Sequence, residues 1–187
     1  MVRETFNCTN KAFPLSVKIR LQPKKEAPEE VDIAASVETA RQIESAGASW
    51  ITIHARTASQ RSATTEPNWS AFKQVVQSLR VPVVANGSIF TLAEAEEVHY
   101  QTGCSGVMAA RGLLANPGMF AGHSVTTNEV IREFVANSCM FGSVASVFHQ
   151  HLIYMLEGRL NASERRLFGT CVGVSSIVDF LRERAML

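Results

Sequence analysis

The sequence predicts an α/β fold over residues 1–122, followed by an all-helical domain over residues 123–187. Three observations lead to this prediction. Four short β-branched runs recur along the first part, apolar residues between them repeat with helical spacing, and from about His123 only helical patterns occur. Parallel strands need long crossover connections, usually helices, and the intervals between these runs are long enough to contain them. We therefore expect a parallel sheet with its crossover helices, and then a second domain.

The four predicted strands are residues 16–21, 49–53, 82–85 and 106–109. Their sequences are SVKIRL, SWITI, PVVA and GVMA, and their starts are 33, 33 and 24 residues apart. Each interval fits one strand, one helix and two short loops. Mostly apolar strands in four consecutive βα units indicate a parallel sheet.

Helical spacing fills the intervals between the strands. Apolar residues repeat at i, i+3, i+4 and i+7 from Phe72 to Leu79, and a similar stripe starts at Ile33. The sequence Thr91-Leu-Ala-Glu94 is a capping box that should begin the next helix. In the second domain we expect helices over residues 143–156 and 163–184. Their predicted core residues are Val147, Leu152, Leu167, Val174 and Val178.

Composition narrows the possible functions. The chain has 187 residues, 46% of them hydrophobic, and a formal net charge of +1. This balance excludes a protein that holds nucleic acid by bulk positive charge. The apolar runs are too short to span a membrane, and the first residues lack the apolar segment of a secretory signal. We therefore expect an intracellular protein, cytoplasmic or nuclear.

Cysteine and histidine spacing argues against a metal site. The four cysteines lie far apart and form no C-x-x-C pair, so we expect them to be free thiols. His149 and His151 are two residues apart, so on a helix their side chains point about 200° away from each other. No metal is expected.

Polar side chains stand in or just after all four predicted strands: Lys18, His54 with Arg56, Asn86 with Gly87, and Arg111 with Gly112. In parallel α/β folds, ligands bind at the carboxyl ends of the strands. A lysine in an otherwise buried run is costly without a partner, which favours a ligand contact for Lys18. Alone, His54 fits a core histidine equally well, and Arg111 fits a salt bridge to a neighbouring helix.

The third and fourth of these loops are typical of a phosphate site. Glycine lets the Asn86-Gly87 backbone approach a ligand, and Arg111 offers a forked cation. In a (β/α)8 barrel, the loops after strands seven and eight commonly bind phosphate together, and a whole barrel needs about 250 residues. Residues 1–122 therefore match the C-terminal half of a TIM (β/α)8 barrel. Either the chain is a fragment, or a partner chain supplies the missing N-terminal half.

The same residues resemble the tRNA-dihydrouridine synthase family. The resemblance rests on VKIRL, ESAGASWITIHARTASQR, VPVVANGSIFTLAEAEEV and TGCSGVMAARGLLANPGMF, and continues in FHQHLIYMLEGRL and SSIVDFL. The motifs H-A-R-T, A-N-G and A-R-G-L-L-A-N-P, in this order, are specific to that family. The sequence is most similar to the eukaryotic subgroup that reduces uridines 20a and 20b of tRNA.

This resemblance implies an enzyme that reduces uridine to 5,6-dihydrouridine with FMN and NAD(P)H, and a C-terminal domain that docks the tRNA. Arg56 and Arg61 match basic positions near the substrate mouth. Ser88 departs from the aspartate that is usual in the family. The implied cofactor contacts are Lys18, His54, Asn86, Gly87, Ser88, Ala110 and Arg111.

The resemblance also implies that the family's catalytic cysteine, the general acid, lies upstream of Met1. Cys8 lacks the family's cysteine motif and precedes the first predicted strand, so it is no substitute. We therefore expect that this chain alone makes no dihydrouridine, unless Cys104 supplies the proton. Two alternatives remain open: a non-catalytic RNA-binding remnant, and another FMN-barrel oxidoreductase that acts on a small molecule. The helical tail argues against the latter.

Overall fold

The computed structural model describes residues 13–60 and 65–187, and the chain divides into two compact units. The first unit contains the residues up to Ile89 together with Ala93–Ala109. The second contains Phe90–Leu92 and Ala110–Leu187. The second unit thus takes in residues 110–122, which the sequence prediction assigned to the first domain. Cys8 and Arg61 lie outside the described residues.

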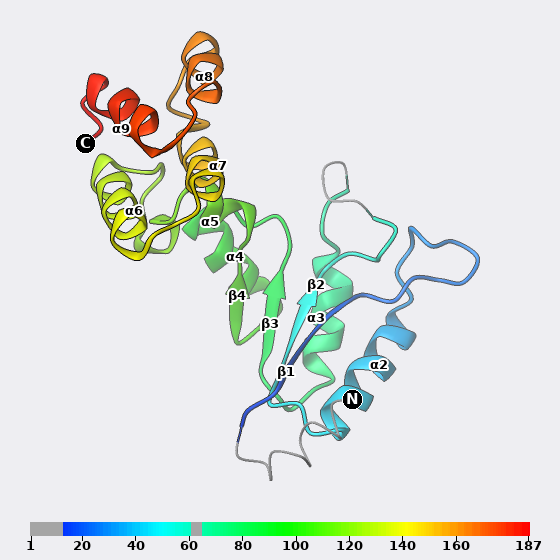
Figure 1. Cartoon of the computed structure of the whole chain (residues 1–187). Coiled ribbons are helices and arrows are strands. Elements are labelled where there is room, and N and C mark those ends of the chain that lie inside the picture. The colour runs from blue at the N-terminus through cyan, green and yellow to red at the C-terminus, as the bar shows by residue number, and fades with distance from the viewer. Residues whose placement is uncertain (1–12, 61–64) are drawn as a thin grey trace. The chain divides into compact units, whose positions relative to one another are not determined.

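A parallel sheet forms the centre of the first unit, and its four strands agree closely with the four predicted runs. The strands follow one another in the order β1-β2-β3-β4, all parallel (Figure 1). Doubly wound sheets reverse their strand order at a switch point, whereas the strands of a barrel wall follow one another in sequence. The strands are β1 (Ser16–Arg20), β2 (Trp50–His54), β3 (Val83–Asn86) and β4 (Gly106–Met108).

A helix follows each of the first three strands, as the apolar spacing predicts. The Asp32 side chain caps the first helix by accepting a hydrogen bond from Ala35 N at 2.9 Å. Asn68 caps the second in the same way, from Ala71 N at 2.8 Å. The third begins directly after Thr91, where the capping box predicts it. These helices are α2 (Ile33–Ser45), α3 (Trp69–Gln77) and α4 (Leu92–Thr102).

Alternate residues of the strands enter one hydrophobic core together with the helices. Ile51, Ile53 and Ala85 are fully buried there, and they belong to the same cluster as Phe72 of α3 and Val98 of α4. Because side chains alternate between the two faces of a strand, the remaining strand residues lie on the opposite face. That second face carries the polar side chains of the sheet.

The described elements of the second unit are helices. Its core joins residues of four helices: Ile131, Phe148, Leu152, Leu156, Phe168, Ile177 and Leu181 are each 0–1% exposed. Two further short elements precede them, α5 (Arg111–Ala115) and a 3-10 turn (Met119–Ala121). The four helices are α6 (Asn128–Phe141), α7 (Ala145–Leu156), α8 (Ala162–Gly169) and α9 (Val174–Glu183).

The predicted core of this unit is wrong at three of its five positions. Leu152 is buried and Val178 packs against the core, but the side chains of Val147, Leu167 and Val174 are 52%, 54% and 36% exposed.

An interruption between α8 and α9 divides the long helix that the sequence pattern predicts. The sequence pattern predicts one helix over residues 163–184, whereas the structure ends α8 at Gly169 and starts α9 at Val174. Gly173 has a φ of +86°, in the left-handed region that glycine adopts readily. The two helices therefore have separate phases: α8 buries Phe168 and exposes Leu167, and α9 buries Ile177 and exposes more of Val174.

Candidate functional site

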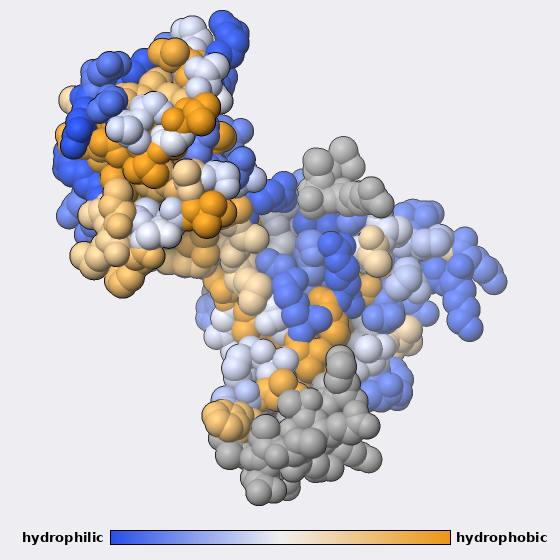
Figure 2. Space-filling view, in the orientation of Figure 1, coloured by the Kyte–Doolittle hydropathy of each residue, from blue (hydrophilic) through white to orange (hydrophobic). Residues whose placement is uncertain are grey.

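Two rows of side chains cross the sheet on the face opposite the helices. They contain two cations, an imidazole and a carboxamide, and none of their members is an Asp or Glu. In Figure 2, hydrophilic side chains gather over the ends of β2 and β3 to which the arrows of Figure 1 point. The row at the carboxyl ends of the strands is Arg20, His54, Asn86 and Met108. The row before it is Lys18, Thr52, Val84 and Gly106.

Lys18 lies exposed on this face, which we call the open face. Burial of its stem and the charge of Arg20 together lower the pKa of its ammonium group. The guanidinium of Arg20 is engaged, because Nη1 donates to the carbonyl oxygen of Thr57 at 2.7 Å. Two cations that repel each other bind best to an anion or an electron-rich oxygen or nitrogen. The open face therefore fits an electron-rich cofactor or substrate group.

Asn86 ties the end of β3 to the neighbouring strands. Its side-chain Nδ2 donates to the backbone carbonyl oxygen of Met108 at 2.8 Å, and its backbone carbonyl oxygen accepts from Ala55 N at 3.0 Å. Gly87, which follows, has a φ of +146°. A Cβ there would lie 3.3 Å from Pro67 and 3.4 Å from the His54 ring. Glycine is thus required where this loop passes close to the imidazole, and the predicted approach of its backbone to a ligand stays a prediction.

Arg56 is buried, with 1% of its surface exposed, and connects the loops above the sheet. Its Nε donates to Thr65 O at 2.6 Å, and its Nη2 donates to Ser88 Oγ at 2.7 Å. Its Nη1 lies 3.2 Å from His54 Nε2. Because a guanidinium only donates, Nε2 accepts and the proton of the neutral imidazole sits on Nδ1.

This arrangement assigns Arg56 a positioning role, because the guanidinium fixes both the orientation and the tautomer of His54. Contact of Arg56 with RNA, which the resemblance implies, stays a prediction. No pattern in the sequence predicts this burial, because the partners of Arg56 come from separate loops.

Ser88 has a φ of +42°, unusual for a residue other than glycine. Its hydroxyl accepts from Arg56, so the serine keeps an acceptor at a position where the family's usual residue is an aspartate. The hydroxyl of Ser88 therefore makes the contact that joins the two loops in this chain.

Ala110 and Arg111 belong to the second unit. Ala110 is the N-cap of α5, and the exposed Arg111 begins that short helix. The guanidinium carbon of Arg111 lies 5.1 Å from the centroid of the Phe90 ring, at cation–π distance. The structure thus brings Lys18, His54 and Asn86 to one face of a sheet. The predicted convergence of Arg111 with them stays a prediction.

The described cysteines are free thiols. Cys104, the residue that we considered as a substitute proton donor, is 1% exposed and belongs to the core on the helix-covered side. No group of three His, Cys, Asp or Glu side chains in residues 13–60 and 65–187 is placed to hold a metal ion. In the same residues, no helix is both long and apolar enough to cross a membrane.

Comparison with known proteins gives a family match. The model of the family described as "Dihydrouridine synthase (Dus)" matches residues 1–168. A mouse protein named "tRNA-dihydrouridine(20a/20b) synthase [NAD(P)+]-like" is 39% identical over 184 residues, which cover 98% of this chain and 54% of the relative. A human protein of the same name is 39% identical over 171 residues, covering 91% of this chain and 51% of the relative. The chain thus spans about half the length of these curated relatives.

A Saccharomyces cerevisiae tRNA-dihydrouridine(20a/20b) synthase is also 39% identical, over 145 residues that cover 75% of this chain and 38% of the relative. Among solved structures, a putative dihydrodipicolinate synthetase from Pseudomonas aeruginosa is similar over 99% of this chain and 60% of the synthetase chain. The sequence identity is 14% and the TM-score is 0.45.

Proposed function

Because this chain belongs to the dihydrouridine synthase family, on its 20a/20b-type branch, we propose that it serves the FMN-dependent reduction of uridine to 5,6-dihydrouridine in tRNA, with NAD(P)H as reductant. The observation that carries the proposal is the open face of the sheet, where Lys18, His54 and Asn86 lie together with no carboxylate in their rows. We also propose that this activity is cytoplasmic or nuclear.

We further propose that the sheet is half of a (β/α)8 barrel. Among the described strands, β1 pairs with β2 and β4 with β3, so the outer edges of β1 and β4 remain available for further strands. Closing a barrel removes such edges and encloses the inner face. Further strands, from another segment or from a partner chain, would convert the open face into the barrel interior.

The side chains of the open face can donate hydrogen bonds to a flavin. Lys18 and the His54 Nδ1–H are suited to carbonyl oxygens and ring nitrogens of the flavin, and Arg56 keeps the His54 proton on Nδ1. The Asn86–Ser88 loop and the Ala110–Arg111 turn would hold the phosphate. When bound, FMN supplies the hydride that reduces the uracil ring. The uridine must leave the RNA stack to reach it, and the helical unit would dock the tRNA.

A proton must also reach the uracil ring. The buried Cys104 faces the helix-covered core, so it is not placed to donate this proton from the open face. Loss of a general acid typically costs about 10²–10⁴ in rate. We therefore propose that the chain needs an acid from further strands of the barrel, and that alone it makes no dihydrouridine.

A chimera tests this function. We would replace the matching part of the mouse relative with this chain, incubate the protein with FMN, NADPH and unmodified tRNA, and measure dihydrouridine by mass spectrometry. The chimera should form dihydrouridine at 20a or 20b, and the isolated chain should not. An inactive chimera that folds and binds tRNA would contradict the proposal and favour the non-catalytic RNA-binding alternative. Full turnover by the isolated chain would contradict the half-barrel argument.

A further inference from the structure

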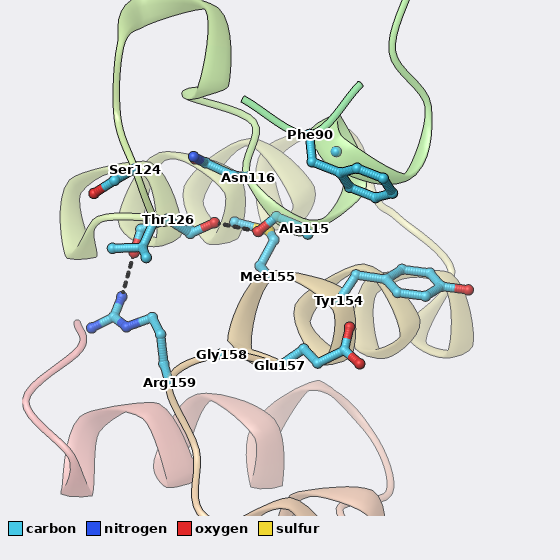
Figure 3. A pocket seen from close by; sticks show the side chains of 12 residues that line it. Phe90, Ala115, Asn116, Ser124, Thr126, Tyr154, Met155, Glu157, Gly158 and Arg159 are labelled. Carbon is cyan, nitrogen blue, oxygen red and sulfur yellow. Dashed lines mark hydrogen bonds between the residues drawn. The ribbon is translucent and has the colours of Figure 1, made fainter. Parts of the chain in front are cut away.

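A small pocket in the second unit has no part in the function proposed above. Its volume is about 210 Å³, and residues of α5, α7 and the loop before α6 line it (Figure 3). Pockets for drug-sized ligands usually measure about 300–1,000 Å³, so this one suits a smaller group such as a single nucleobase.

Two aromatic rings and one carboxylate mark the side of this pocket. Phe90 and Tyr154, 41% and 38% exposed, both line it, and Figure 3 shows their rings on the same side with the Glu157 carboxylate close to Tyr154. No ion pair joins Glu157 to another side chain in the described part of the chain. A planar ring can stack on the exposed aromatic face, and the carboxylate can accept hydrogen bonds from the edge of that ring.

Three arginines lie in the lining of this pocket or next to a residue that lines it. Arg159 lines the pocket and is fixed there, with Nη1 donating to Thr126 O at 3.0 Å. Arg165 lines a neighbouring cavity of about 290 Å³ that shares Tyr154 and Glu157 with the first. Its Nη1 donates to the Glu157 carbonyl oxygen at 3.2 Å. Arg111 stacks on Phe90. The pocket and its immediate surroundings thus carry three cations and one anion, which disfavours a cationic ligand and favours one that carries its own negative charge.

We propose that this pocket binds a guanine nucleotide. The base would lie against Tyr154, its N1–H and 2-amino group would donate to the two oxygens of Glu157, and the phosphate would face Arg165. Guanine fits because its Watson–Crick edge places two N–H donors side by side, which matches a carboxylate. The proposal deepens the function above and rests on it in one respect, since single-stranded RNA is the expected source of the nucleotide.

Direct binding tests the proposal with the whole chain. GMP, IMP, AMP and CMP would be titrated by calorimetry, together with short single-stranded RNAs that contain guanine, inosine or adenine at one position. GMP should bind tighter than IMP, which lacks the 2-amino group, and tighter than AMP and CMP. Tighter binding of the guanine-containing RNA than of GMP identifies RNA as the source, and equal binding identifies the free nucleotide. Equal affinities for all four bases would overturn the proposal.

Substitutions in the pocket separate stacking from edge recognition. Tyr154→Ala should weaken GMP binding about tenfold, whereas Tyr154→Phe should keep it, because stacking needs only the ring. Glu157→Gln should abolish the preference for GMP over AMP. Tyr100→Ala and Glu129→Gln, exposed residues outside the pocket, are the matched controls. Circular dichroism checks the folding of each variant.

Unchanged binding in both pocket variants would overturn the assignment. A chimera that forms dihydrouridine but shows no preference for guanine would contradict the guanine pocket and leave the proposed function intact.

Discussion

The two faces of the sheet in the first unit differ sharply, although the same strands form both. The covered face buries Ile51, Ile53 and Ala85 completely against the helices, while the open face presents Lys18 and His54. Parallel strands that are buried on both faces read as nearly continuous apolar runs. Here polar residues alternate with apolar ones along β1 and β2. The covered face therefore stabilises the fold, whereas the polar side chains of the open face are available to contact a ligand.

The largest effect should come from the covered face. Ile53→Ala removes a fully buried side chain, and we expect the free energy of unfolding to fall by about 2–5 kcal/mol. Lys18→Met, on the next strand but the open face, should change it by less than about 0.5 kcal/mol. Urea unfolding followed by circular dichroism measures both. Equal losses would show that the faces do not differ in this way.

The second effect concerns the loops above the open face. Arg56→Met leaves Thr65 O and Ser88 Oγ without their buried donor, and we expect a loss of stability of about 2–4 kcal/mol. The His54 ring should also lose its fixed tautomer, which NMR of the imidazole nitrogens reports directly. A variant with unchanged stability and an unchanged His54 tautomer would refute the positioning role of Arg56.

A smaller effect lies on the helix-covered side. The Glu44 carboxylate of α2 accepts from Arg80 N at 2.7 Å and Val81 N at 2.9 Å, and these backbone hydrogen bonds lower the pKa of the carboxyl group. Glu44→Gln should lower stability by about 1 kcal/mol at pH 7. A carboxyl group whose pKa is lowered by folding stabilises the folded state at pH values above its unfolded pKa of 4.5. This stabilisation is lost as the pH falls through the pKa of the folded state.

The difference between wild type and Glu44→Gln should therefore be constant above about pH 6 and shrink below about pH 4. Unfolding curves at several pH values measure it. Glu38→Gln, an exposed position on the same helix, is the control. A difference that does not change with pH would rule out the carboxylate as its source.

The sequence predicted the sheet well, because β-branched runs at regular spacing specify strands through local preference and burial. It also predicted that Lys18, His54 and Asn86 share one side, since parallel strands in register bring equivalent positions together. It failed at the break between α8 and α9, where apolar residues continue across Gly173 in apparent phase while the backbone does not. Local glycine conformation decided that outcome.

The burial of Arg56 could not be predicted from the sequence either. Its partners Thr65 and Ser88 lie 9 and 32 residues away in separate loops, and only the folded chain brings them to one guanidinium. Periodicity describes the faces of helices and strands, and carries no information on which loops meet. The pocket beside Tyr154 was missed for the same reason, because α5, α7 and a loop form it together.

The central claim is that the open face is the side that meets the flavin. The most direct test is the FMN affinity of the chimera, measured by quenching of flavin fluorescence, for wild type, Lys18→Met and Lys73→Met. Lys73 lies exposed on α3, on the helix-covered side of the sheet. Removing a charged hydrogen-bond donor costs about 1.5–3 kcal/mol, so Lys18→Met should bind FMN about ten- to a hundredfold more weakly, and Lys73→Met should bind it as wild type does. Equal FMN affinities for the three proteins would show that the open face is not the side that meets the flavin.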